Sequence, residues 1–162
     1  TRYAMKTFSI AFSLLLGLST AAMAQPEART YEKISHRADL IFSGTVVRQH
    51  CYFRSDSTLV TETVFNDLGI VKSTNTGRSD NDPELRITYA GGSLDGKIVL
   101  YPDIPELVVG KRYFVFVKDD GAFHPNPFPG GCKAVIEIFR DTVNGTETLS
   151  PVSSCRPVAL AP

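Results

Sequence analysis

The sequence lacks the residue patterns that identify the common enzyme classes. It contains no G-x-S-x-G nucleophile motif, no H-E-x-x-H metal motif and no Walker phosphate-binding loop. These absences remove the usual signals for a serine hydrolase, a zinc protease or a nucleotide-binding enzyme. An excess of positive charge is also missing, because 17 acidic side chains balance 17 basic ones. A basic surface for nucleic acid is therefore not expected.

Long apolar runs are scarce, and the clearest one lies near the start of the chain. Lys6 precedes an apolar stretch at residues 8–18, and small residues follow at 19–24. This order predicts a secretory signal peptide that is cut between Ala24 and Gln25. No other stretch approaches the roughly 20 apolar residues that a membrane span needs. We therefore expect a periplasmic or secreted protein that is not inserted in a membrane after cleavage.

Residues 25–162 are expected to form one domain, once the extension at residues 1–4 and the predicted signal are set aside. Without Arg2 and Lys6 this region carries 15 basic and 17 acidic side chains, a net charge of −2. Its Val, Ile, Thr, Phe and Tyr residues cluster in short runs between Gly, Pro, Asn and Asp groups. That distribution is typical of an all-β domain.

Apolar spacing predicts one short helix followed by a series of strands. Tyr31, Ile34 and Ala38 recur at helical spacing, which predicts a helix over residues 28–37. Alternating or continuous apolar runs predict strands at 39–50, 58–72, 84–90, 96–101, 112–118, 133–140 and 146–149. Between the strands we expect a break near 66–69, an exposed loop at 73–82, a wide turn at 91–96 and a hairpin turn at 144–145.

This series of elements suits a small closed or nearly closed β-barrel of five or six strands, with a sandwich as the alternative. Gly44 lacks a side chain in the middle of a predicted strand, so it is expected to mark a bulge where the barrel bends. The residues expected in the barrel core are Phe42, Val46, Ile87, Val115 and Ile138.

Several short segments resemble a known group of domains. They are residues 37–47, 88–92 and 109–116, together with the Gly-Gly pair that precedes the strand at 133–140. In these segments the chain resembles small exported bacterial domains that are similar to the OB-fold barrels of netrin modules and of tissue inhibitors of metalloproteinases. The resemblance implies an OB-like barrel, and some members of the bacterial group accompany secreted metalloproteases. The metalloproteinase inhibitors chelate zinc through an N-terminal cysteine, whereas the expected terminus here is Gln25, so that mechanism is not carried over.

The three cysteines are an odd number for an oxidising compartment. One disulfide and one remaining thiol are the simplest outcome. Cys132 and Cys155 flank the last predicted hairpin, and we favour their pairing because the hairpin would bring them together. A bridge from Cys51 to either of the other two stays open, because connectivity does not follow from sequence.

Metal and catalytic sites are weakly indicated. His50, Cys51, His124 and Cys132 have the chemistry of a soft metal site, but they lack close-spaced pairs such as C-x-x-C. No metal and no cofactor are therefore expected. A site assembled from scattered residues remains the alternative, and it would require His124, Asp95 and Cys51 to converge in one pocket.

The most unusual candidate for the surface is the segment at residues 121–131, called the proline loop below, which contains Pro125, Pro127 and Pro129. Prolines pre-set an extended backbone, so a side chain held on this loop loses little entropy when it meets a partner. The candidate partner-binding residues are His124, Asn126 and Phe128. The alternative is a rigid loop whose Phe128 turns into the core, as the burial tendency of Phe favours.

The sequence thus predicts a non-catalytic exported module that binds a protein partner, with a secreted protease as one candidate. The competing hypothesis is a small hydrolase or metal-dependent enzyme with a site built from scattered residues.

Overall fold

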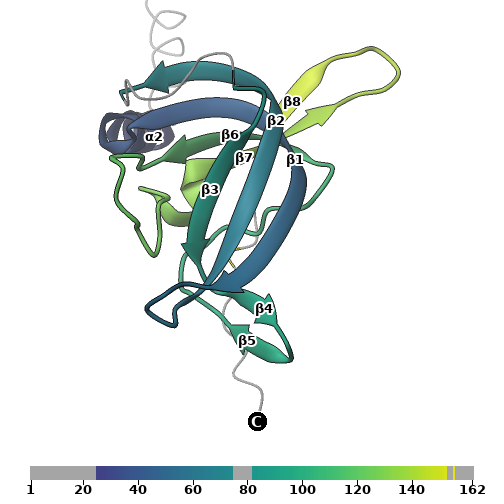
Figure 1. The fold of residues 1–162 in the computed structure, drawn as a ribbon. Helices are drawn as coiled ribbons and strands as arrows, with labels where there is room; N and C mark the ends of the chain where they lie inside the picture. The colour runs from purple at the N-terminus through teal and green to yellow at the C-terminus, as the bar shows by residue number, and fades with distance from the viewer. Residues whose placement is uncertain (1–24, 75–81, 153–154, 156–162) are drawn as a thin grey trace, which may run out of the picture. The chain divides into compact units, whose positions relative to one another are not determined.

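The computed structural model describes residues 25–74, 82–152 and 155. The predicted signal segment at 1–24 and most of the predicted loop at 73–82 lie outside these residues. The elements, shown in Figure 1, are helix α2 (Gln25–Arg37), strands β1 (Leu40–Phe53), β2 (Leu59–Ser73), β3 (Leu85–Ala90), β4 (Gly92–Leu94), β5 (Lys97–Val99) and β6 (Arg112–Val117), the 3-10 turn η1 (Gly131–Ala134), and strands β7 (Val135–Arg140) and β8 (Glu147–Pro151).

The main structural unit is one six-stranded antiparallel sheet, which confirms the all-β prediction. Its strands follow the order β3-β2-β1-β6-β7-β8, and β4 and β5 form a separate two-stranded ribbon. The expected closed barrel is not present, because within the described residues no ladder joins the edge strands β3 and β8. Closure would need such a ladder. Instead, the chain that leaves β3 turns directly into the ribbon.

Strand β1 is long and strongly curved, and it connects the two halves of the sheet (Figure 1). It pairs with β2 over most of its length and with β6 over its first half. Its register with β2 shifts at Gly44, where Ser43 pairs with Gly69 but Thr45 pairs with Asn66. A side chain at Gly44 would place its Cβ only 3.0 Å from the Leu68 side chain. The predicted bulge is therefore confirmed at this glycine.

The core is built from the buried faces of β1, β2, β3 and β6. Four of the five expected core residues are buried there, and their exposed fractions are 0% for Phe42, Val46 and Val115 and 6% for Ile87. Ile138 was expected to be buried but is only half-buried. It pairs with Leu149 of β8, which is itself 65% exposed, because the β7–β8 hairpin extends beyond the covered part of the sheet (Figure 1).

Helix α2 begins earlier than expected, at Gln25. A boundary between two compact units of the chain falls inside it, after Lys33, and the sheet belongs to the unit that begins at Ile34. Within that unit Ile34 and Ala38 are buried, as the helical spacing predicts. A Cβ at Gly130 would lie 2.5 Å from Ile34 Cδ1, so the missing side chain there allows close packing. No helix in the described residues is long and apolar enough to cross a membrane.

Three local expectations were wrong in detail. Strand β2 runs from Leu59 to Ser73 without the break expected near 66–69. Residues 91–96 were expected to form a wide turn, but they contain β4 and the tight turn that leads into β5. Asp95 and Gly96 have φ values of 51° and 77°, and two consecutive positive φ angles are typical of a type I′ hairpin turn. The strand expected from residue 133 starts only at Val135, because η1 occupies the preceding residues.

Candidate functional site

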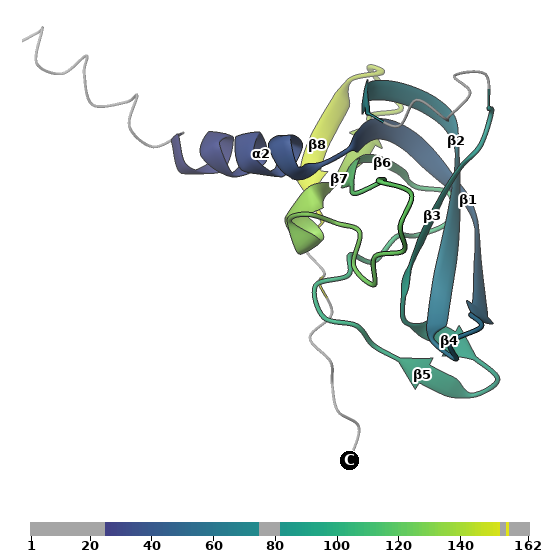
Figure 2. The same ribbon diagram turned by 60° about the vertical axis from the view of Figure 1, so that its left-hand side comes forward.

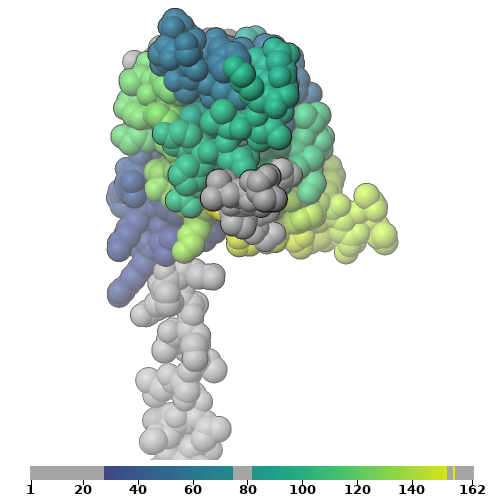
Figure 3. Space-filling view, turned by 90° about the horizontal axis from the view of Figure 1, so that it is seen from below, coloured from purple at the N-terminus to yellow at the C-terminus, as the bar shows by residue number. Residues whose placement is uncertain are grey.

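A groove of about 380 Å³ lies where the ribbon meets the main sheet. We call it the ribbon groove. Figures 1 and 2 both show the ribbon beyond the ends of β1, β2 and β3, and Figure 3 views the molecule from that end. The residues that line the ribbon groove come from three parts of the chain: Gln49, Cys51 and Thr61; Tyr89, Ala90, Gly91, Gly92 and Ser93; and Ile98, Val99, Leu100, Tyr101, Ile104, Pro105, Glu106 and Leu107.

The floor of the ribbon groove is polar and fully hydrogen-bonded. Cys51, Thr61 and Tyr89 lie side by side on adjacent strands. The Thr61 hydroxyl donates to the Gly91 carbonyl at 2.8 Å, and it lies 3.4 Å from the Cys51 sulfur. The Gln49 amide donates to the Leu107 carbonyl at 3.1 Å. These hydrogen bonds restrict the side chains of the floor to one arrangement.

Tyr89 is the titratable group of the floor whose pKa is shifted by its surroundings. Burial raises the pKa of its hydroxyl above the ordinary value, and the hydroxyl lies 3.1 Å from Thr63 Oγ1. The phenol is neutral near pH 7 at its ordinary pKa, and the shift moves its ionisation to still higher pH. Near neutral pH it therefore takes part in the floor as a hydrogen-bonding group.

The ribbon approaches the floor closely at Gly92. This residue has a φ of 134°, and a Cβ there would lie 2.5 Å from Thr61 Oγ1 and 2.8 Å from Cys51 Sγ. Both the backbone conformation and the missing side chain therefore require glycine. As a result the start of β4 packs directly against the Cys51 thiol, which takes part in no disulfide.

The rim of the groove exposes an unusual amount of apolar surface. The exposed fractions are 69% for Ile98, 42% for Val99, 44% for Leu100 and 42% for Tyr101, and all four residues line the groove. We call these four residues the apolar rim. Exposed apolar residues that gather at one groove mark interaction surfaces more often than isolated ones do.

The proline loop is a structural element rather than an exposed anchor. Phe128 is only 3% exposed, and its ring centroid lies 5.7 Å from that of Tyr89. Asn126 accepts a hydrogen bond from the Phe128 amide at 3.0 Å and donates to the Asp103 carbonyl at 3.3 Å. The structure therefore agrees with the alternative expectation, in which Phe128 turns into the core. The Phe128 ring offers no surface to a partner.

The carbonyl groups of the proline loop complete the ends of two strands. The amide of Ala90, at the end of β3, donates to the Pro125 carbonyl at 2.8 Å. The amide of Lys118, directly after β6, donates to the Pro127 carbonyl at 2.8 Å. His124, the third predicted site residue, lies beside Asp120 at 2.8 Å and lines a different pocket.

Cys132 and Cys155 form a disulfide, with their Cα atoms 5.7 Å apart. This is the pairing that the position of the last hairpin favoured. It leaves Cys51 as a thiol in the ribbon groove, on a strand far from the bridge in sequence.

The three residues of the alternative enzyme hypothesis do not converge. Cys51 lines the ribbon groove, His124 lines the other pocket, and Asp95 lines neither of them. Successive side chains of a strand point to opposite faces of a sheet. Cys51 is therefore separated from Tyr52, its neighbour in β1, which lines the same pocket as His124. Within the described residues no three His, Cys, Asp or Glu side chains are grouped to hold a metal ion.

No protein-family model, curated protein or solved structure matches this chain.

Sequence reasoning missed the ribbon groove because its walls come from segments that are distant along the chain. The available signal was the unbroken apolar run from Ile98 to Tyr101, next to a turn of strong hairpin type at Asp95-Gly96.

Proposed function

We propose that this chain is a non-catalytic, exported binding module that engages a protein partner at the ribbon groove. The observation that carries the proposal is the apolar rim, which exposes four large apolar side chains at a groove with a fixed floor. When a partner removes such a surface from water, the free energy of the complex falls by roughly 25 cal/mol per Å² of apolar area buried.

The geometry favours an extended peptide segment of the partner. Strand β5 is hydrogen-bonded to β4 alone among the described strands, so one of its edges is open to another strand. Addition of a strand to an exposed edge supplies main-chain hydrogen bonds, while alternate side chains enter neighbouring pockets. A partner segment with apolar side chains would thereby cover the exposed Ile98 and Tyr101.

The chemistry of the groove supports a binding role over catalysis. The Tyr89 hydroxyl is bonded to Thr63, and the Cys51 thiol is packed against the start of β4. Glu106 is the single carboxylate among the residues that line the groove. General acid–base catalysis commonly uses a pair of groups with shifted pKa values, and no such pair lines this groove.

A secreted protease is one candidate for the partner, because the sequence resembles modules of the netrin and metalloproteinase-inhibitor type. The expected mature terminus at Gln25 supplies no cysteine for zinc chelation. A protease would therefore have to be engaged through the groove. Export is part of the proposal, and intact-mass measurement of protein from the envelope or the medium should find a chain that begins at Gln25. A chain that retains residues 8–18 would contradict it.

The groove can be tested with two matched exposed substitutions. Ile98→Asp places a charge on the apolar rim, and Val143→Asp places one in the β7–β8 hairpin, where Val143 is 92% exposed. Both variants should melt at the temperature of the wild type, because both side chains are already in water. Photo-crosslinking in the native envelope should capture a partner with the wild type and with Val143→Asp, but not with Ile98→Asp. Equal capture by both variants would rule out the groove as the binding site.

A further inference from the structure

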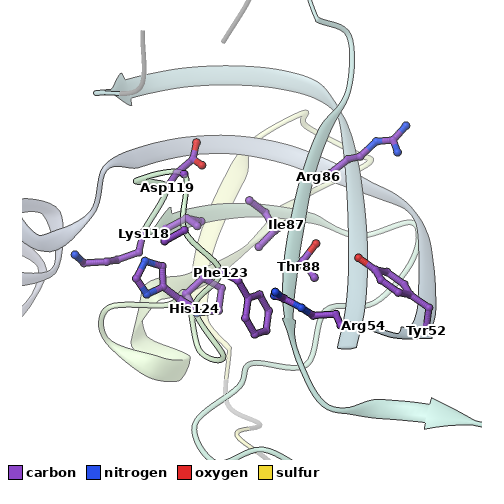
Figure 4. A pocket seen from close by; sticks show the side chains of 13 residues that line it. Tyr52, Arg54, Arg86, Ile87, Thr88, Lys118, Asp119, Phe123 and His124 are labelled. Atoms are coloured by element: carbon purple, nitrogen blue, oxygen red, sulfur yellow. The ribbon is translucent and has the colours of Figure 1, made fainter. Parts of the chain in front are cut away.

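A second pocket, of about 310 Å³, lies beside the edge strand β3 and the proline loop (Figure 4). We call it the arginine pocket. The residues that matter here are Tyr52, Arg54, Thr88, Lys118, Phe123 and His124. It is distinct from the ribbon groove, because Tyr52 and Thr88 alternate along their strands with the groove residues Cys51 and Tyr89.

The guanidinium of Arg54 is positioned by an aromatic ring. Its central carbon lies 3.7 Å from the centroid of Phe123, and the side chain is 31% exposed. Figure 4 shows this end of Arg54 at the Phe123 ring. Stacking on an aromatic face orients a guanidinium while leaving its edge of N–H donors accessible.

The donors of Arg54 are not used by the rest of the described structure. Its one ion pair joins Nε to Asp56 Oδ2 at 3.9 Å, which is too long for a hydrogen bond. The Asp56 carboxylate instead accepts the Thr58 amide at 3.0 Å, and this bond is the main reason that the pKa of Asp56 is lowered. The arginine is therefore held in place without an acceptor within hydrogen-bonding distance in the described part of the chain.

Two hydroxyl groups share the pocket with Arg54. Tyr52 and Thr88 lie on the same face of the sheet. Thr88 of β3 is paired with Glu62 of β2, and Glu62 is paired with His50 of β1, so these three side chains share a face. Tyr52 lies two residues after His50 on β1 and therefore points to that face as well. The ring of Tyr52 stacks on that of His50, with centroids 5.8 Å apart. Neither hydroxyl has a hydrogen-bond partner among the described residues. Each can donate to a bound oxygen atom.

The other charges of the pocket are either paired or directed elsewhere. His124 is bonded to Asp120 at 2.8 Å, and Arg86 lies 3.7 Å from Glu62 and 3.8 Å from Glu84. In Figure 4 the Asp119 carboxylate points away from Arg54. The Lys118 side chain likewise points away from Arg54 in Figure 4. The group that best matches these donors is an anion with several acceptor oxygens.

We infer that the arginine pocket binds an oxyanion, a carboxylate or phosphate group carried by a small molecule with an apolar body. Arg54 would bind two oxygens of the anion, and the Tyr52 and Thr88 hydroxyls would donate to it. The Phe123 ring would contact the apolar body. The volume of the pocket lies at the lower end of the range for small-molecule sites. This inference does not depend on the proposed partner groove.

Titration of the isotope-labelled protein with benzoate, phenyl phosphate and the neutral analogue benzamide, at constant ionic strength, tests the inference. Saturable shifts should appear with one or both anions at residues 52–54, 86–88 and 118–124, and benzamide should give none. Whichever anion binds more tightly identifies the group as carboxylate or phosphate. Arg54→Gln should weaken binding by about tenfold or more, because hydrogen bonds to charged groups are the strong ones.

Two further variants separate loss of the site from loss of the fold. Tyr52→Phe combined with Thr88→Val removes both hydroxyls with little change of shape, and it should weaken binding several-fold while the amide spectrum stays native. Arg140→Gln removes the same charge from β7, outside the pocket, and should bind as the wild type does. Equal weakening by Arg54→Gln and Arg140→Gln would overturn the inference. Shifts that lie elsewhere, or no saturable shift with either anion, would also overturn it.

Discussion

Truncation of Phe128 to alanine should cost the fold much of its stability. The side chain is 3% exposed and packs against the Tyr89 ring. Replacing a buried phenylalanine by alanine costs about 3–5 kcal/mol, the sum of lost transfer free energy and of the cavity left behind. The total free energy of unfolding of a domain is about 5–15 kcal/mol. The loss should lower the melting temperature by roughly 10–20 °C.

The proline loop should loosen in the same variant, because Phe128 fixes the loop to the core. Ala90 and Lys118 donate their amides to this loop, at 2.8 Å in each case. Their hydrogen exchange should therefore become faster in Phe128→Ala than global destabilisation alone explains. Urea unfolding gives the free energy, and exchange monitored by NMR gives the local effect.

Phe139→Ala is the matched control, because Phe139 is 46% exposed on β7. It should lose less than about 1 kcal/mol, since surface truncations away from the core are mild. If Phe128→Ala were as stable as Phe139→Ala, the assignment of Phe128 to the core would be refuted. The exposed-anchor hypothesis for the proline loop would then return.

Three further outcomes are expected. Val115→Asp should not fold, because an unpaired charge at a site with 0% exposure costs several kcal/mol, and a soluble variant with a cooperative melting transition would contradict this. Replacement of both Cys132 and Cys155 by serine should lower the free energy of unfolding by about 3 kcal/mol, and peptide mapping after thiol alkylation should find Cys51 alkylated. Stability should fall as pH rises above about 10, because burial raises the pKa of Tyr89 above its unfolded value and the unfolded chain ionises first. Tyr89→Phe should reduce this alkaline loss in urea unfolding, and an unchanged pH profile would argue against a buried neutral phenol.

Features that depend on neighbours along the chain could be predicted from the sequence. The strand at 112–118 is a continuous apolar run, and the structure has β6 there with Val115 at its centre. Gly44 shows as a gap in an alternating pattern, and it does mark the bulge. The bridge between Cys132 and Cys155 follows from a hairpin that is itself encoded locally.

Closure of the sheet could not be predicted, because it depends on which strands meet at the edges. Periodicity shows that a strand has a buried face, but it does not identify the partner that covers that face. Ile138 illustrates this limit, since its alternation with Glu137 resembles that of a core strand although the β7–β8 hairpin leaves it half-buried. The candidate sites could not be predicted for the same reason, because they form where distant segments of the chain meet. Arg54 and Phe123 meet only because the proline loop returns to the end of β1.

The carbonyl groups that the proline loop presents to the sheet have a consequence for self-assembly. An unclosed sheet can add strands from other molecules at its edges, which leads to polymers. At the Ala90 end of β3 the outward amide is already bonded to Pro125. The prolines of this loop have no N–H group, so they cannot donate hydrogen bonds to a further strand. The loop therefore occupies the outward amide of Ala90, to which an added strand would otherwise bond.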